Sequence, residues 1–159
     1  MIIDEVRNMA ISFRKAIISL KQLPKIKGHF FEKFPLGACG TTCDLFMYYL
    51  SKKGIESEYY NGTFKFKTIN SIHGWVGFGD FYIDLTADQF NIIGDLEFPG
   101  IIFDNKEKYP LLPYLENINN GVGVKGELVY FRYEYDLIVD VIENGYSEER
   151  IVKKIFNFD

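Results

Sequence analysis

Sulfur and imidazole are scarce in this chain. Its 159 residues include two cysteines and two histidines. Two cysteines are too few for a disulfide scaffold, and cysteines four residues apart on one helix have poor geometry for bridging. We therefore expect free thiols, which are typical of a reducing compartment.

Long hydrophobic runs are also missing. The N-terminal stretch MIIDEVRNMAISFRKAIISLKQL is interrupted by charged side chains and lacks the unbroken apolar run of a signal peptide. No segment approaches the ~18 to 20 apolar residues that a membrane-spanning helix needs. The sequence therefore predicts a cytoplasmic protein, with secretion by a route that needs no cleaved signal left open as an alternative.

Excess positive charge is lacking as well. The net charge is −4, which gives no electrostatic reason to bind nucleic acid or an anionic membrane. Hydrophobic residues make up 47% and charged residues 25%, as in ordinary globular domains. The length suits a single domain over residues 1–159, and fifteen Phe and eleven Tyr predict a core of large rings.

The hydrophobic pattern predicts an α+β fold, with N-terminal helices, a mainly antiparallel sheet in the middle and C-terminal helices. Apolar residues at helical spacing indicate helices over 2–22 and 40–53, separated by a loop and ended by Gly54. Residues 55–69 are typical of a strand, and 71–86 of a hairpin that turns at Gly79-Asp80.

The second half of the chain gives weaker signals. Residues 91–126 are rich in proline, glycine and aromatics, which favours loops and short strands around the core. We expect a strand over 126–135 and helices over 136–143 and 147–156, with Ser147 as the N-cap of the last helix.

His73 lies in the first strand of the predicted hairpin, in the segment SIHGWVGF. A tight turn at Gly79-Asp80 pairs positions whose numbers sum to about 159, so His73 falls near Thr86 and one diagonal step from Asp84. Diagonal neighbours on one face of a sheet are ~7 to 8 Å apart, within reach of side chains. We therefore predict that Asp84 accepts a hydrogen bond from Nδ1 of His73 and leaves Nε2 free.

Cys39 lies in FPLGACGTTCDLF, after a Pro-Leu-Gly break and at the start of the second helix. A thiol in the first turn of a helix is close to unpaired N–H groups and to the positive end of the helix dipole, and both lower its pKa. Facing a histidine, it can form the thiolate–imidazolium pair of Cys-His enzymes. The N–H groups of the turn can also stabilise an oxyanion.

These segments resemble the transglutaminase-like branch of the papain-like cysteine peptidase superfamily, over residues 34–90. The family's nucleophile segment resembles Gly-x-Cys with a small residue four positions on and a helix ending in Gly-Ile. Gly37, Cys39, Cys43, Gly54 and Ile55 stand at those places. In the family, this segment is followed by a strand that ends in Gly, which corresponds to Gly62 here. A His-Ala-Trp segment and an Asp-x-Thr segment come next, and they correspond to residues 73–75 and 84–86. The segments FPLGACGTT and IDLTADQF also resemble a bacterial and phage subgroup of uncharacterised proteins.

The resemblance implies a papain-like or transglutaminase-like core and a reaction that needs no cofactor. It assigns Cys39 as the nucleophile, His73 as the general base and acid, and Asp84 as the group that orients the imidazole. Cys43 stands where the family usually has Ala or Ser, which implies a packing role. Gly74 replaces the usual Ala, which we interpret as a mild substitution.

The expected substrate contacts come from residues beside this trio. We predict that Gly37, Ala38 and Trp75 contact the substrate, although Trp75 fits a core position better. Papain relatives also use a polar side chain from before the nucleophile in the oxyanion hole. Gln22 and His29 are the two candidates for it here, and both are weak.

Other assignments stay open for the same residues. Cys39 and His73 also fit buried core positions, Asp84 also fits a cap in the turn-like DLTAD, and Cys43 is the alternative nucleophile. We interpret Gln89 as the start of a turn, with a contact to the site as the alternative. The cysteines, histidine and aspartate are also zinc-ligand types. However, C-x₃-C on a helix is unusual for structural zinc and no second pair is present, so we expect no metal.

Two classes of function follow. The first is a cysteine enzyme that transfers acyl groups from amides of a protein or peptide substrate, as a peptidase, amidase or glutamine deamidase, and less readily a transglutaminase. The second is a catalytically silent module that uses the same fold to bind a peptide.

Overall fold

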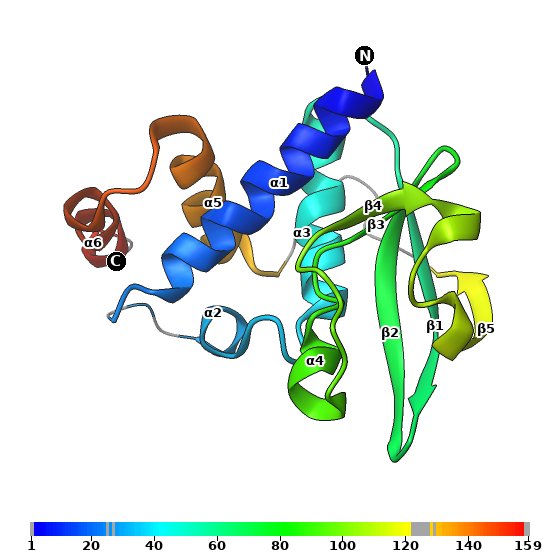
Figure 1. Ribbon diagram of the computed structural model, residues 1–159. Coiled ribbons are helices and arrows are strands. Elements are labelled where there is room, and N and C mark those ends of the chain that lie inside the picture. The colour runs from blue at the N-terminus through cyan, green and yellow to red at the C-terminus, as the bar shows by residue number, and fades with distance from the viewer. Residues whose placement is uncertain (1, 25, 27, 122–127, 129, 158–159) are drawn as a thin grey trace. The chain divides into compact units, whose positions relative to one another are not determined.

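The computed structural model describes residues 2–24, 26, 28–121, 128 and 130–157 (Figure 1). The fold is α+β, with an N-terminal helix, a five-stranded antiparallel sheet and C-terminal helices, which confirms the predicted class and order. The chain divides into two compact units, residues 1–34 with 129–159 and residues 35–128. Among the described residues, no helix is long and apolar enough to cross a membrane.

In the described part of the first unit, the regular elements are all helices. They are α1 (Ile2–Lys21), α2 (His29–Lys33), α5 (Arg132–Asn144) and α6 (Glu148–Phe156). The predicted stripe of α1 is buried at Val6, Ala10, Phe13, Ile17 and Leu20, and α1 packs against α5. At the start of α6 the Ser147 hydroxyl accepts a hydrogen bond from the backbone N–H of Arg150 at 3.3 Å, which confirms the predicted N-cap.

In this unit, the structure differs from the sequence-based prediction at two elements. The expected loop after α1 contains the short helix α2. The expected strand over 126–135 is wrong where it is described, because α5 begins at Arg132; residues 126, 127 and 129 lie outside the described part. Tyr and charged residues alternate there as in a strand, but Tyr135, Ile138 and Val141 recur at helical spacing and are buried on one face.

The second unit is built on the sheet. Its strands are β1 (Glu58–Phe66), β2 (Ile69–Phe78), β3 (Phe81–Asp84), β4 (Ile102–Asn105) and β5 (Leu115–Asn120), in the spatial order β4-β3-β2-β1-β5. Its helices are α3 (Cys39–Lys52) and α4 (Gln89–Gly94), with the 3₁₀ turns Lys106–Lys108 and Leu112–Tyr114. Helix α3 packs against β2.

The hairpin of β2 and β3 has the predicted register. Val76 pairs with Ile83, Gly77 with Tyr82 and Phe78 with Phe81, so each pair sums to 159. The turn contains Gly79 at φ 54°, a left-handed backbone conformation that glycine adopts without steric cost. This register brings the residues that follow β3 back beside the middle of β2.

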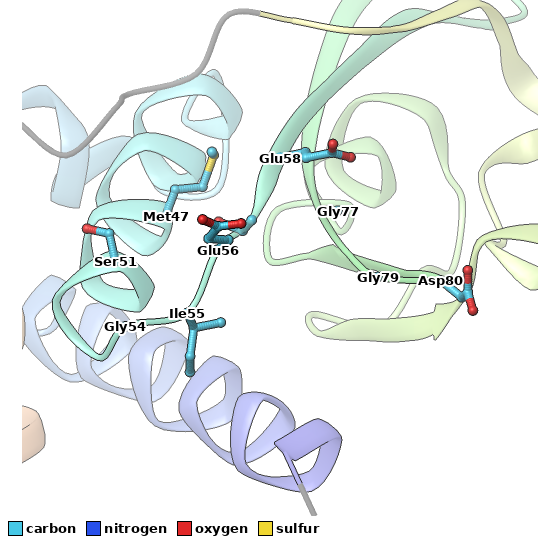
Figure 2. A pocket seen from close by; sticks show the side chains of 10 residues that line it. Met47, Ser51, Gly54, Ile55, Glu56, Glu58, Gly77, Gly79 and Asp80 are labelled. Atoms are coloured by element: carbon cyan, nitrogen blue, oxygen red, sulfur yellow. The ribbon is translucent and has the colours of Figure 1, made fainter.

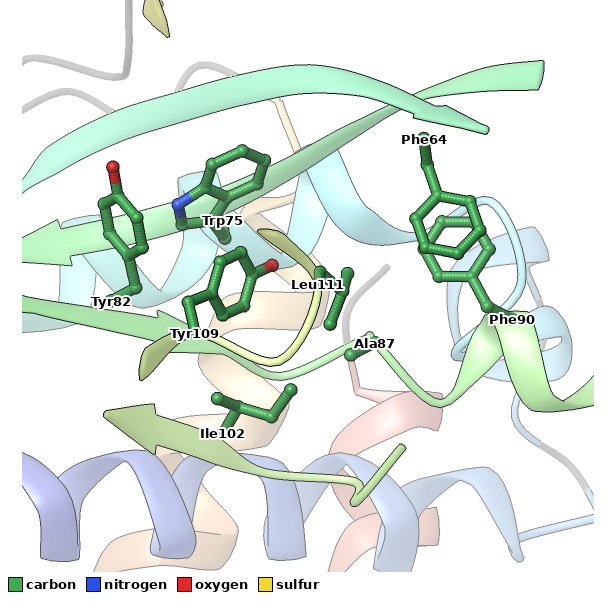
Figure 3. Packing of buried hydrophobic residues seen from close by; sticks show 8 residues of the cluster. All are labelled: Phe64, Trp75, Tyr82, Ala87, Phe90, Ile102, Tyr109 and Leu111. Atoms are coloured by element: carbon green, nitrogen blue, oxygen red, sulfur yellow. The ribbon is translucent and has the colours of Figure 1, made fainter. Parts of the chain in front are cut away.

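Aromatic rings fill the core of this unit, as the composition predicted (Figure 3). Phe64 and Phe90 stack with their ring centroids 3.6 Å apart, and Trp75 packs against Tyr109 with centroids at 5.2 Å. The segment 91–126 was predicted as loops and short strands, and its residues 122–126 lie outside the described part. Its described part supplies Tyr109 to this core and adds β4 and β5 to the two edges of the sheet. The core lies directly beside His73.

Candidate active site

His73 and Asp84 meet in the interior of the second unit. Nε2 of His73 lies 2.6 Å from Oδ2 of Asp84, and neither side chain has exposed surface. The hairpin register accounts for this contact, because β3 ends at Asp84 on the strand beside His73. The predicted choice of ring nitrogen is wrong. Asp84 holds Nε2, and Nδ1 instead lies 3.3 Å from Nε2 of Gln89.

Three further hydrogen-bond donors hold the Asp84 carboxylate. The Tyr109 hydroxyl donates to Oδ2 at 2.6 Å, the backbone N–H of Thr86 donates to Oδ1 at 2.9 Å, and the Thr86 hydroxyl lies 3.5 Å from Oδ1. Burial favours the neutral carboxyl, but the charge of His73 and these hydrogen bonds lower the pKa of Asp84 below its usual value. The site therefore holds an ionised carboxylate in the core.

The imidazole of His73 is fixed by rings as well as by polar groups. The Trp75 ring stacks on it with centroids 5.9 Å apart, and Phe90 meets it edge-on at 5.0 Å. Burial lowers the pKa of His73, but the charge of Asp84 and hydrogen bonds to Asp84 and Cys39 raise it to about 9. A histidine with this pKa is protonated at neutral pH.

Cys39 is the first residue of α3 and is partly exposed. Burial raises the pKa of Cys39, but interactions with the charged imidazole of His73 and with the backbone of Gly74 outweigh it, so the pKa lies below its ordinary value. Because Asp84 occupies Nε2, proton exchange with the thiol requires Nδ1, the nitrogen that also faces the Gln89 amide.

Cys43 lies one turn further along α3, and its environment is different. Its side chain is buried, and burial together with the charges of Cys39, Asp84 and Asp44 raises its pKa well above the ordinary value. A thiol of this kind stays protonated and unreactive at neutral pH. The geometry agrees with the packing role expected for Cys43.

Sequence reasoning missed the contact of Tyr109, and for Gln89 it favoured a turn over the contact with the site that it gave as the alternative. Tyr109 lies in the aromatic and proline-rich segment, where no motif distinguishes one tyrosine from another. Gln89 was interpreted as a turn residue, but it begins α4, is buried, and contacts the His73 ring. Its Oε1 also accepts a hydrogen bond from the backbone N–H of Gly37 at 3.4 Å.

Gly74 also makes room for a neighbouring aromatic ring. A Cβ atom at Gly74 would lie 2.4 Å from the hydroxyl oxygen of Tyr59, and a Cβ at Gly121 would lie 2.4 Å from Cδ1 of the same ring. The Tyr59 ring is thus held in a slot between two glycines. Its pKa is raised to about 12 by burial and by the charges of Cys43, Cys39 and Asp44. A side chain at position 74 would therefore displace the Tyr59 ring, so Gly74 makes room for Tyr59.

The predicted substrate-contact residues fall in three different settings. Gly37 is exposed at φ 63°, whereas Ala38 is nearly buried as the residue before α3. Trp75 is fully buried in the aromatic core beneath His73. A substrate contact at Gly37 or Ala38 stays a prediction. Gln22, which is exposed, and His29 belong to the other unit.

A separate open pocket of about 990 Å³ lies in the second unit (Figure 2). It is lined by the second half of α3, the start of β1 and the β2–β3 turn, and the carboxylates of Glu56, Glu58 and Asp80 border it. Cys39, His73 and Asp84 are not part of its lining. Among the described residues, no group of three or more His, Cys, Asp or Glu is placed to hold a metal ion.

No protein-family profile, curated protein or solved structure matches this chain.

Proposed function

We propose that this protein is a cysteine-dependent acyl-transfer enzyme acting on amide bonds of a protein or peptide. The proposal is supported by the buried hydrogen bond between His73 and Asp84 and by the interaction with His73 that lowers the pKa of Cys39. A binding surface needs no such arrangement, whereas a thiol that must ionise at neutral pH needs a charged imidazole beside it.

The reaction follows from the protons that these groups hold. The Cys39 thiolate attacks the amide carbonyl carbon, and N–H groups in the first turn of α3 stabilise the oxyanion. Nδ1 of His73 gives its proton to the departing amine, and the C–N bond breaks to leave a thioester on Cys39. Nδ1 then takes a proton from water or from a second amine, which attacks the thioester and releases the thiolate. Asp84 stays ionised throughout and holds Nε2–H.

We infer that the fold around this site is a papain-like or transglutaminase-like core. Support comes from the order of the parts. The thiol begins a helix that packs on the sheet, the histidine lies on a central strand, and the acid ends the adjacent strand. Attack by water gives a peptidase, amidase or glutamine deamidase, and attack by an amine gives a transglutaminase. We favour hydrolysis or deamidation.

Covalent acetylation with p-nitrophenyl acetate tests this proposal. The protein should release p-nitrophenol in a rapid first turnover and gain one acetyl group, located on Cys39 by tandem mass spectrometry. The Cys39→Ala variant should show neither, while Cys43→Ala should retain both. If the burst disappears in Cys43→Ala and persists in Cys39→Ala, the nucleophile is Cys43 and the assignment of Cys39 is wrong. The absence of an acyl-enzyme in the wild type would favour a peptide-binding module.

A further inference from the structure

The side-chain amide of Gln89 bridges two parts of the site. Its Oε1 accepts from the backbone N–H of Gly37 at 3.4 Å, and its Nε2 lies 3.3 Å from Nδ1 of His73. The side chain is 7% exposed, so water does not readily replace either contact. A backbone N–H can only donate, and it therefore requires the oxygen of the amide on its side. This leaves the NH₂ group facing the imidazole.

The NH₂ group of Gln89 can donate to Nδ1 only when that nitrogen carries a lone pair. Asp84, on the other side of the ring, requires a proton on Nε2. Both neighbours therefore select the same neutral tautomer, with its proton on Nε2. When His73 is protonated, Nδ1–H and the amide N–H of Gln89 face one another as two donors. Gln89 thus favours the neutral ring, and Asp84 favours the charged one.

The other groups around the ring do not duplicate this effect. Asp84 from β3 and Cys39 from α3 are the titratable groups that contact His73, and both raise its pKa. Tyr109 reaches Asp84 rather than the ring. Helix α4 contributes Gln89 and the uncharged ring of Phe90. Among these described contacts, Gln89 is the one that opposes protonation.

We propose that Gln89 is a positioning residue of the site, whose amide fixes the Nε2–H tautomer of His73 and opposes protonation at Nδ1. Its role in catalysis rests on the acyl-transfer function proposed above. A general acid and base works best when its pKa is near the working pH, and the Asp84 carboxylate raises the pKa of His73 above its ordinary value. Through Gly37, two residues before Cys39, the same amide also ties the loop of the nucleophile to the ring.

Nitrogen NMR of the histidine side chains tests this proposal without a substrate. The chain has two histidines, so a His29→Gln variant assigns both signals. The experiment is performed in a Cys39→Ala background, which removes the thiol from Nδ1. We expect neutral His73 to carry its proton on Nε2. In Gln89→Met, which keeps the length but removes the amide, the protonation midpoint should rise by about 0.5 to 1 pH unit, the effect of losing one hydrogen bond.

A second variant covers the case in which Gln89→Met does not fold. Gln89→Glu keeps an acceptor for Gly37 N–H but places a carboxylate opposite Nδ1, and the midpoint should then rise further. An unchanged or lowered midpoint in a folded Gln89→Met or Gln89→Glu protein would overturn the proposal, as would a neutral ring protonated on Nδ1. Acetylation of Cys39 is measured separately, so failure of the acyl-transfer function and failure of the Gln89 proposal give different results.

Discussion

Nε2 of His73 donates a 2.6 Å hydrogen bond to Oδ2 of Asp84, with both side chains buried where β3 ends. This contact decides which ring nitrogen of His73 is available to other groups. It commits Nε2 to the carboxylate and leaves Nδ1 for the thiol of Cys39 and the amide of Gln89. The account of the site therefore depends on keeping Asp84 ionised in the core.

Tyr109 should contribute to that ionised state. Tyr109→Phe removes the hydroxyl that donates to Oδ2 and leaves the ring in the aromatic cluster. A hydrogen bond to a buried charge contributes about 1.5 to 3 kcal/mol, so we expect a decrease of this size in the free energy of unfolding in urea. Tyr82→Phe, which alters a ring of the same cluster, is the control and should cost less. Equal losses in the two variants would contradict the role of the Tyr109 hydroxyl.

Gly74 and Tyr59 should be energetically coupled. Gly74→Ala places a Cβ 2.4 Å from the Tyr59 hydroxyl, and Gly121 closes the other side of the ring, so the ring must leave its slot. We expect Gly74→Ala to destabilise the protein by about 1 to 3 kcal/mol. The same substitution should be nearly neutral in a Tyr59→Ala background. A double-mutant cycle on the free energy of unfolding measures the coupling, and additive effects would show that the two residues do not compete for space.

The raised pKa of His73 has a consequence for stability. The pKa is about 9 in the folded chain against 6.5 for an ordinary histidine. The protonated His73 ring therefore stabilises the folded state. This contribution to the free energy of unfolding is fully present below pH 6.5 and is lost as the pH rises through 9. In Cys39→Ala, which loses the contribution of the thiol to this shift and keeps that of Asp84, unfolding should become easier by on the order of 2 kcal/mol as the pH rises above 6.5.

Histidine variants separate this effect from general alkaline destabilisation. In the Cys39→Ala background, the His29→Gln variant should still lose stability as the pH rises. The His73→Gln variant should not. The measurement is the free energy of unfolding in urea at a series of pH values. A loss that survives in His73→Gln would mean that another group causes it.

The sequence was most informative where local pattern decides structure. The alternation around Gly79-Asp80 determined the β2–β3 register, and that register brings Asp84 to His73. The apolar stripe of α1 was equally clear because helical periodicity is a local signal. The position of Cys39 at the first residue of α3 differs by one residue from the predicted helix start.

Features that depend on packing between distant segments could not be predicted. The choice of Nε2 over Nδ1 depends on Gln89 occupying the other side of the ring. The Tyr109 hydroxyl reaches Asp84 from 25 residues away, and the slot of Tyr59 needs Gly121. The start of α5 was misassigned because tyrosines and charges alternate over only a few residues, too few to separate a strand from a helix.

The most direct test of an activated Cys39 is its alkylation rate by iodoacetamide as a function of pH, in a Cys43→Ala background that leaves one thiol. We predict a midpoint clearly below the ordinary cysteine value of about 8.5. His73→Ala should raise this midpoint by at least about one pH unit and slow labelling roughly tenfold at pH 6.5. A midpoint at the ordinary value that does not move when His73 is replaced would contradict the account.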